Sequence, residues 1–359
     1  MASGPLDGIK VVEFAGLGPG PFAGMLLSDL GAEVVEIARE GVAPPPPSRG
    51  DARGRKRICL NLKTPEAVET CLQLAAKADV VFEGNRPGVM ERLGLGPDVM
   101  LARNPALVYG RMTGWGQTGP LSHAAGHDIN YLAITGLLHA IGPAERPVPP
   151  LNLAADYGGG AMFLVVGMLS ALLSARISGK GQVIDVAMSD CATYLGTVFH
   201  NFQASGAWQD RREANLLDGG AHFYGNYECS DGKFVSIGSI EPQFYQLLLD
   251  KTGAAQSLPH QQMDRAKWPE MREALRSVFL TRTRDEWCAL MEGTDVCFAP
   301  VLTLAEARQH PHQVEREVFV EAEGTLQVAP APRFSDTPAR IQWLATDRQW
   351  TAEEILANW

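Results

Sequence analysis

The sequence predicts an α/β protein with a doubly wound, Rossmann-like large domain followed by a smaller α+β domain. Over the first third of the chain, short apolar runs alternate with segments of helical spacing, which is typical of βαβ units. After about Asp218 the pattern changes to two adjacent strand-like runs followed by helical stretches. We therefore expect a large domain over 1–200, to which 333–359 return, and a small domain over 218–332.

The strands expected in the large domain are 9–14, 33–37, 79–82, 107–109 and 183–186. Each is an apolar run of strand length, and a helix is expected at 22–30 between the first two. A second helix begins at Asp156 and reaches about Ser178, where Gly179 and Gly181 end it. Its apolar part, 161–173, is too short to cross a bilayer, so we expect a buried helix.

The small domain is expected to begin with a hairpin. The runs 223–229 and 234–237 flank the turn sequence Asp231-Gly232. Helical stretches follow around 242–249, 269–280 and 284–291, and the proline-rich segment 329–332 ends the domain. A last helix, 351–358, is expected to pack outside it.

The charge is unevenly distributed along the chain. The 359 residues carry a formal net charge of -10, which argues against nucleic acid or an anionic membrane as the main partner. One basic cluster, 49–57, holds four arginines and Lys56 against a single acid, Asp51. The stiff segment 44–47, four prolines, is expected to present this cluster on a surface loop, where it would receive a small polyanion.

The cysteines and the chain start favour a reducing cytoplasm. The six cysteines show no CxxC pair and no metal-ligand spacing, so we expect reduced side chains and no metal site. The first residues lack the charged and apolar regions of a signal peptide. Cytoplasmic localisation is the resulting expectation.

The loop after the first strand has the spacing of a dinucleotide-binding motif. The sequence GLGPGPFAG at 16–24 follows a strand and precedes a helix. However, Pro19 and Pro21 have no N–H group to offer a pyrophosphate, and Arg39 stands where such enzymes place an acid. A tight turn that requires glycine is the better interpretation.

Five longer segments carry a resemblance to a known family. They read RMTGWGQTGP (111–120), GHDINY (126–131), PLNLAADYGGG (150–160), GKGQVID (179–185) and GSIEPQFY (238–245). With the opening strand and loop, they resemble the family III CoA-transferases, and within them the α-methylacyl-CoA racemase branch, from about Leu6 to Pro332. One departure is His222 in the sequence GGAH, where this branch usually has GGAP. We expect it to alter the rim of the site or the substrate preference.

The resemblance implies a fold, an activity and a set of site residues. The fold is an interlocked homodimer in which the large domain of one subunit and the small domain of the other form each site. The activity is racemisation of 2-methylacyl-CoA thioesters in lipid metabolism, with no cofactor besides the CoA of the substrate. His127 and Asp156 are implied as the acid/base pair, and Glu241 supports His127 from the partner subunit. The implied CoA contacts are Arg39, Leu60, Asn61, Leu62, Lys63, Gly84, Asn85, Arg86, Arg92, Gly126, Asp128, Ile129, Asn130 and Tyr131.

The chemistry of racemisation suits these residue types. Inverting the carbon next to a thioester carbonyl requires a base on one face and an acid on the other, and a His and an Asp with shifted pKa values serve both roles. Because Asp156 stands at a predicted helix start before Gly158–Gly160, we expect free N–H groups there to hold the enolate oxygen. The three glycines are expected to let the substrate approach the backbone.

Alternatives remain open from the sequence. A CoA-transferase of the same fold would use Asp156 as a nucleophile that forms an acyl anhydride. A non-catalytic acyl-CoA-binding protein would leave His127, Asp156 and Glu241 without a purpose. Asp128 either tunes His127 or caps a helix. Four methionines form either a soft acyl-binding surface or ordinary core: Met112, Met162, Met168 and Met188. The natural acyl chain is not fixed by the sequence.

Overall fold

The computed structural model describes residues 4–256, 261–346 and 348–359, and it divides into two compact units. The large unit comprises Met1–Thr135, Leu151–Gly196 and Val314–Trp359. The small unit comprises Gly136–Pro150 and Thr197–Gln313. Each unit is described by itself.

A six-stranded parallel sheet forms the centre of the large unit, with the strand order β3-β2-β1-β4-β5-β6. This is the doubly wound order expected of a Rossmann-like domain. The strands are β1 (Lys10–Phe14), β2 (Glu33–Arg39), β3 (Arg55–Leu60), β4 (Val80–Glu83), β5 (Val108–Thr113) and β6 (Gln182–Ala187). β3 was not among the expected strands, because its basic residues mask the alternating pattern.

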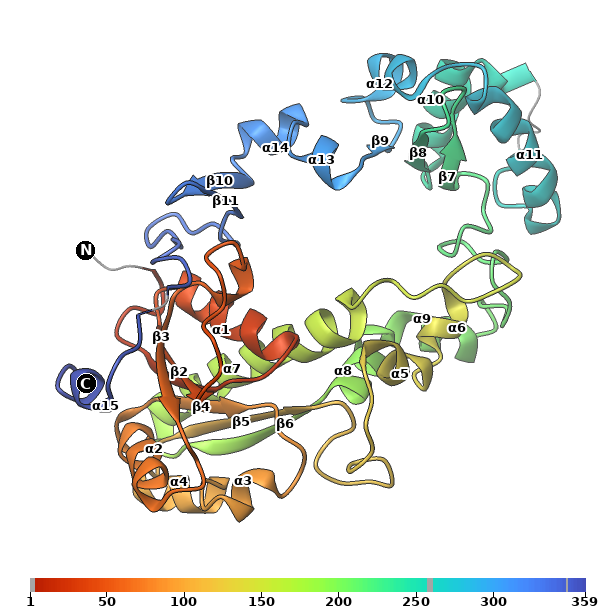
Figure 1. Cartoon of the computed structure of the whole chain (residues 1–359). Coiled ribbons are helices and arrows are strands. Elements are labelled where there is room, and N and C mark those ends of the chain that lie inside the picture. Colours follow the sequence, from red (N-terminus) through yellow and green to blue (C-terminus); the bar gives the residue numbers. More distant parts are fainter. Residues whose placement is uncertain (1–3, 257–260, 347) are drawn as a thin grey trace. The chain divides into compact units, whose positions relative to one another are not determined.

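Helices cover both faces of this sheet (Figure 1). One face packs against α1 (Pro19–Asp29) and α7 (Phe163–Ser178) through side chains such as Leu27 and Leu164. The other face packs against four helices, α2 (Pro65–Lys77), α3 (Val89–Arg92), α4 (Pro97–Arg103) and the C-terminal α15 (Ala352–Leu356). Ile355 of α15 is fully buried in that second layer, so the end of the chain belongs to the large unit as expected.

The strand order reverses between β1 and β4. From β1 the chain adds β2 and β3 on one side of the sheet, and it then adds β4, β5 and β6 on the other side. At such a switch point the loops after the two central strands diverge and leave a crevice at the carboxyl edge. The loop after β1 turns sharply at Gly18, whose φ of 65° favours glycine. The prediction of a glycine-dependent turn is therefore confirmed.

The basic cluster 49–57 does not present free charge, which corrects the sequence expectation. Each of its five basic side chains pairs with an acid of the large unit at 2.5–3.5 Å. The pairs are Arg49–Asp51, Arg53–Asp29, Arg55–Glu13, Lys56–Glu33 and Arg57–Glu36. Most of the cluster lies on or next to β3 in the sheet. Burial raises the pKa of Glu13, and the charge of Arg55 acts in the opposite direction.

A π-helix, Leu153–Met162, runs directly into α7. The combined helix, Leu153–Ser178, is long and apolar enough to cross a membrane by length and composition, and 44% of its most apolar window is buried inside the protein. Leu164 and Met168 of α7 pack so closely on Gly110 of β5 that a Cβ there would meet both within 3.3 Å. This is the packing of a core helix, and such a helix is weak evidence for a membrane span.

The small unit has a three-stranded antiparallel sheet, β7-β8-β9, and its hairpin forms at the predicted place. Its core contains the buried Phe223, Trp268, Phe279 and Trp287. The elements are α6 (Leu137–Ala140), α9 (Thr197–Ala204), β7 (Tyr224–Glu228), β8 (Phe234–Gly238), α10 (Pro242–Thr252), α11 (Trp268–Phe279), α12 (Arg284–Met291), β9 (Phe298–Val301) and α13 (Leu304–Ala307).

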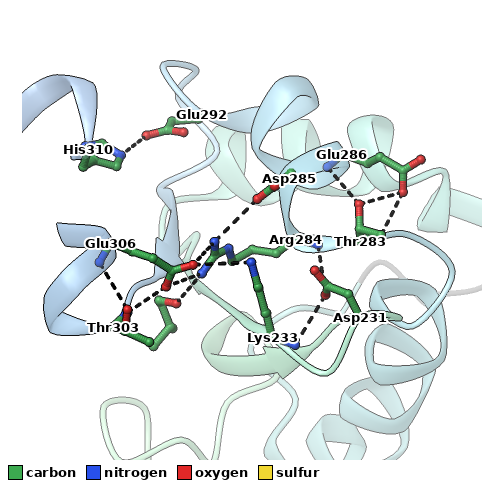
Figure 2. A network of polar contacts seen from close by, with 11 residues as sticks. Asp231, Lys233, Thr283, Arg284, Asp285, Glu286, Glu292, Thr303, Glu306 and His310 are labelled. Atoms are coloured by element: carbon green, nitrogen blue, oxygen red, sulfur yellow. Dashed lines mark hydrogen bonds and ion pairs between the residues drawn. The ribbon is translucent and has the colours of Figure 1, made fainter. Parts of the chain in front are cut away.

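A polar network ties α12 to α13 and to the hairpin turn (Figure 2). The buried guanidinium of Arg284 donates two hydrogen bonds, at 3.1 and 2.7 Å, to the Glu306 carboxylate and holds the pKa of Glu306 well below its usual value. Lys233 pairs with the same carboxylate, and Asp231 accepts from the backbone N–H of Arg284. The network fixes the segment after β9 on the small unit.

The units differ from the expected domain boundaries in three places. Residues 197–200, expected in the large domain, belong to the small unit as the start of α9. The hairpin of β10 (Phe319–Ala322) and β11 (Thr325–Val328) lies in the large unit, because Arg53 donates to Gln327 Oε1 and to the carbonyl of Val328. Gly136–Pro150 belongs to the small unit, where Arg212 donates to the carbonyls of His139 and Pro143.

Candidate active site

A cavity of about 580 Å³ opens at the switch point of the large unit. Its walls are the loops that follow β1, β4 and β5, together with one residue of the π-helix. His127 and Asp156 both line it, so the structure brings the expected acid/base pair into one cavity.

His127 stands at the start of a short helix, α5 (Asp128–Ala133). Its backbone N–H donates to Asn130 Oδ1 at 3.1 Å, and its carbonyl accepts from the N–H of Asn130 at 2.8 Å. These two bonds fix the backbone of His127 while its side chain stays exposed toward the cavity.

Asp128 connects α5 to the π-helix through the backbone of Asp156. Its Oδ2 accepts from the N–H of Ala155 at 2.9 Å and from the N–H of Asp156 at 2.7 Å. Asp128 is 6% exposed, so these charge-assisted bonds lie out of water. The structure therefore uses Asp128 to hold the two catalytic candidates together, and its side chain is not free for the expected contact with CoA.

The environment of Asp156 moves its pKa toward neutrality. Burial is the main cause that raises the pKa of Asp156, and the nearby charge of Asp128 raises it further. A hydrogen bond from Asn152 Nδ2, at 3.4 Å, and the proximity of His127 act in the opposite direction. A carboxyl group with a raised pKa can both donate and accept a proton near its working pH.

The expectation of free N–H groups at Asp156 was wrong in its details. The helix begins at Leu153, so Asp156 lies within its first turn and does not cap it. The N–H groups of Ala155 and Asp156 are already bonded to Asp128, and the N–H of Tyr157 donates to the carbonyl of Asn152. A π-helical segment cannot be inferred from residue spacing, and such segments are frequent at functional sites.

The glycines 158–160 serve packing within the protein, where substrate approach was expected. A Cβ on Gly159 would lie 2.9 Å from the backbone N of Ala192 in α8 (Met188–Leu195), and one on Gly160 would meet the Met188 and Met112 side chains. α8 therefore lies against the π-helix at a distance that only glycine permits. Met112 and Met188 also line the cavity, whereas Met168 is fully buried in the core.

An aromatic pair forms another wall of the cavity. Trp115 and Tyr131 meet edge to face, with ring centroids 4.8 Å apart, and the Tyr131 hydroxyl donates to the carbonyl of Gly126. A Cβ on Gly114 or Gly126 would collide with the Tyr131 ring. Trp115 was not predicted as a site residue, although it lies in the family segment 111–120. The glycines on either side of it, Gly114 and Gly116, are the sequence signal that could have identified it.

The expected CoA contacts fall into two groups. Gly84, Asn85, Arg86, Gly126 and Tyr131 line the cavity. The others do not: Arg39, Leu60, Asn61, Leu62, Lys63, Arg92, Asp128, Ile129 and Asn130. Arg39 and Leu60 are nevertheless register partners at the carboxyl ends of β2 and β3, on the same edge of the sheet as the cavity.

Exposed cations at the carboxyl edge of the sheet lack an acidic partner among the described residues. Arg39, Lys63, Arg86 and Arg92 are exposed and make no ion pair with the residues that the structure describes. They follow the carboxyl ends of β2, β3 and β4. This edge, and not the paired cluster 49–57, therefore offers the free positive charge that phosphate groups require.

Glu241 and His222 belong to the small unit. Glu241 precedes α10, and its exposed carboxylate makes no hydrogen bond or ion pair within the described parts of the chain. The His222 side chain is 0% exposed and is hydrogen-bonded to the Tyr245 hydroxyl. The His222 side chain therefore lies in the core of its own unit, so any effect on the rim of the site or on substrate preference is indirect.

No cluster of three or more His, Cys, Asp or Glu side chains able to hold a metal ion occurs among the described residues. The six cysteines are free. The arrangement in the large unit is thus a cavity with a histidine and a carboxyl group, bordered by unpaired cations.

Comparison with known proteins agrees with this arrangement. The family model described as CoA-transferase family III matches residues 6–345. The alpha-methylacyl-CoA racemase of Mus musculus is 47% identical over 339 residues, 93% of this chain and 87% of that protein. The racemase of the same name from Homo sapiens is 43% identical, with the same coverage. A crystal structure of a CAIB/BAIF family protein from Brucella suis superposes with a TM-score of 0.84 at 27% identity, over 99% of both chains.

The substitution Asp128→Asn tests the anchor at Asp156. Replacing the carboxylate removes a negative charge that raises the pKa of Asp156, so we expect this pKa to fall from its raised wild-type value. Carbon-13 NMR titration of aspartate-labelled protein measures the change, with Asp156→Asn to assign the signal. An unchanged or higher pKa of Asp156 in Asp128→Asn would contradict the electrostatic role of Asp128.

Proposed function

Because the chain belongs to CoA-transferase family III, we propose that it is an isomerase that interconverts (R)- and (S)-2-methylacyl-CoA thioesters. The observation that carries the proposal is the placement of His127 and Asp156 in one cavity, with burial raising the pKa of Asp156. The identity of 47% and 43% to two alpha-methylacyl-CoA racemases supports the same activity.

The proposed reaction moves one proton at a time. One member of the pair removes the proton from C2 of the acyl group, and the C2–H electrons form an enolate with the thioester carbonyl. The other member then donates a proton to the opposite face of C2, and the electrons of the enolate return to the new C–H bond. The same steps run in reverse from the other enantiomer, so no cofactor or second substrate takes part.

The CoA group is proposed to bind along the carboxyl edge of the sheet. Arg39, Lys63, Arg86 and Arg92 supply unpaired positive charge for its phosphates. Residues 60–63, 84–86 and 126–131 complete the binding surface, with Asp128 contributing through its backbone because its side chain holds Ala155 and Asp156. Arg86 and Tyr131 line the same cavity as His127 and Asp156, which supports one connected surface for the phosphates and the acid/base pair.

We propose that the protein works as a homodimer in which Glu241 of the partner subunit supports His127. A glutamate bonded to the imidazole would stabilise its protonated form. The carboxylate of Glu241 is exposed and unpartnered, as this role requires. α7 also exposes an apolar stripe of Val166, Leu173 and Ile177, and adjacent α8 exposes Tyr194. Exposed apolar surface of this kind is typical of a subunit interface.

Six free cysteines accord with the proposed cytoplasmic location.

A CoA-transferase that uses Asp156 as a nucleophile is the alternative. It needs the same aspartate but has no use for a histidine in the same cavity, which is why racemisation is favoured.

Incubation in D₂O separates the two activities. We expect (S)-2-methylacyl-CoA, supplied without a second acid, to gain deuterium at C2 and to lose its configuration.

His127→Ala and Asp156→Ala should each lower kcat by about 10²- to 10⁴-fold, because each removes one proton-transfer group, while CoA affinity is retained. Mass spectrometry and chiral chromatography measure both outcomes. No deuterium at C2, together with transfer of CoA to an added acceptor acid, would instead support the transferase.

Arginine variants test where the phosphates bind. Arg86→Ala should raise KM about tenfold with kcat unchanged, because it removes a cation that contacts CoA in both the ground and transition states. Arg49→Ala is the matched control, since Arg49 is exposed but already paired with Asp51. Steady-state kinetics give both constants. A larger KM increase in Arg49→Ala than in Arg86→Ala would restore the cluster 49–57 as the phosphate site.

Mixed dimers test the shared site. His127→Ala and Glu241→Ala chains carry different tags and are co-expressed, so that about half of the dimers contain one of each. If each site combines two subunits, every mixed dimer has one intact site, and the mixture reaches about a quarter of wild-type activity. If Glu241 acts within its own chain, no mixed dimer has an intact site, and the activity equals the mean of the two variants.

A further inference from the structure

Glu241 is carried on a firmly held part of the small unit. It immediately precedes α10, and its carbonyl accepts from the N–H of Tyr245, one turn into the helix, at 2.9 Å. The direction of the Glu241 carboxylate therefore depends on the first turn of α10.

The residues before Glu241 are held separately. The buried amide of Gln262 donates to the carbonyls of Ser239 and Ile240, at 2.9 Å each. The hydroxyl of Ser239 donates to the carbonyl of Val296 at 2.5 Å. The approach to α10 is thus fixed from two sides, and what remains is the orientation of the helix start itself.

One side-chain bond acts on that helix start. His222 Nε2 lies 2.8 Å from the hydroxyl of Tyr245, and both side chains are buried. Their rings meet edge to face with centroids 5.3 Å apart, and Phe223 packs against both. The Tyr227 hydroxyl donates to the carbonyl of His222, which anchors the histidine to β7. A chain of contacts therefore leads from the sheet of the small unit to the first turn of α10.

The histidine is retained at an energetic cost. Its Nδ1 is buried without a hydrogen-bond partner among the described residues, which disfavours a polar ring at this position. Burial, and the charge of nearby Arg272, lower the pKa of His222 to about 4, so the ring is neutral near pH 7. An apolar side chain would fill the same space without an unsatisfied nitrogen. The bond to Tyr245 is the one feature of His222 that an apolar residue does not reproduce.

We propose that His222 is a positioning residue that, through the hydroxyl of Tyr245, fixes the first turn of α10 and thereby the place of the Glu241 carboxylate. The inference rests on the proposed function of Glu241 as the support of His127 from the partner subunit. It gives the GGAH sequence a role in the reaction although His222 has no contact with solvent or substrate.

Single variants measure the effect on the reaction. Tyr245→Phe removes the hydroxyl and keeps the ring, so kcat for racemisation should fall about three- to tenfold with KM changed less than about twofold. His222→Leu should lower kcat by a similar factor, whereas His222→Gln, which keeps a polar atom near the position of Nε2, should restore most of it. Tyr109→Phe is the matched control, because it removes another buried hydroxyl bond, to the carbonyl of Leu95 in the large unit, and should leave kcat unchanged.

A double-variant cycle distinguishes positioning from general stability. If His222 and Tyr245 act through Glu241, adding Tyr245→Phe to Glu241→Ala should not lower kcat further. A full kcat in Tyr245→Phe, or the same factor of loss in the Glu241→Ala background as in the wild type, overturns the inference while the proposed function stands. A Glu241→Ala enzyme with wild-type kcat would instead remove the role of Glu241 itself, and this inference with it.

Discussion

The carboxylate of Asp128 holds the candidate active site together. It lies at the start of α5 and accepts the N–H groups of Ala155 and Asp156, so one buried side chain joins the backbone next to His127 to the first turn of the π-helix. Without it, two buried N–H groups would lose their partners, at a cost of about 1–3 kcal/mol each. The same negative charge raises the pKa of Asp156. Geometry and proton affinity at the site thus depend on one group, which never needs to touch the substrate.

The basic side chains of the large unit are of two kinds, those that form ion pairs within the sheet and those that are exposed at its carboxyl edge. Cations within or beside the sheet, such as Arg53 and Arg55, form ion pairs with buried acids and stabilise the fold. Cations at the carboxyl edge, such as Arg39 and Arg86, make no ion pair with the described residues and lie on the edge where the doubly wound topology creates a crevice. The density of basic residues along the chain is therefore a poor guide to anion binding, because a strand places its charges opposite those of its neighbours. Asp51 lies within the cluster, but the other four acidic partners come from β1, β2 and the end of α1, far away in sequence or within apolar runs.

Most strands of the large unit could be predicted because apolar runs bounded by turns are local signals. His127 and Asp156 were implied by continuous motifs of the family, and the structure places both in one cavity. β3 could not be predicted by periodicity, because its Arg and Lys side chains are neutralised across the sheet. The glycines 158–160 were expected to permit a close approach to the backbone, but the element that approaches is α8 and not the substrate. Sequence spacing does not place α8 beside them. His222 was noticed as a departure, yet its burial depends on Tyr245, 23 residues away. In each case the missing information is a contact between segments distant in the chain.

The central claim is that His127 and Asp156 act on the carbon next to the thioester carbonyl. A crystal structure of the protein with bound 2-methylacyl-CoA tests it most directly, since C2 and the carbonyl carbon occupy different places in the two chemistries. We expect C2 to lie between the imidazole of His127 and the carboxyl group of Asp156, with the phosphates near Arg39, Lys63, Arg86 and Arg92. A complex in which Asp156 instead faces the carbonyl carbon, with His127 remote from C2, would contradict it.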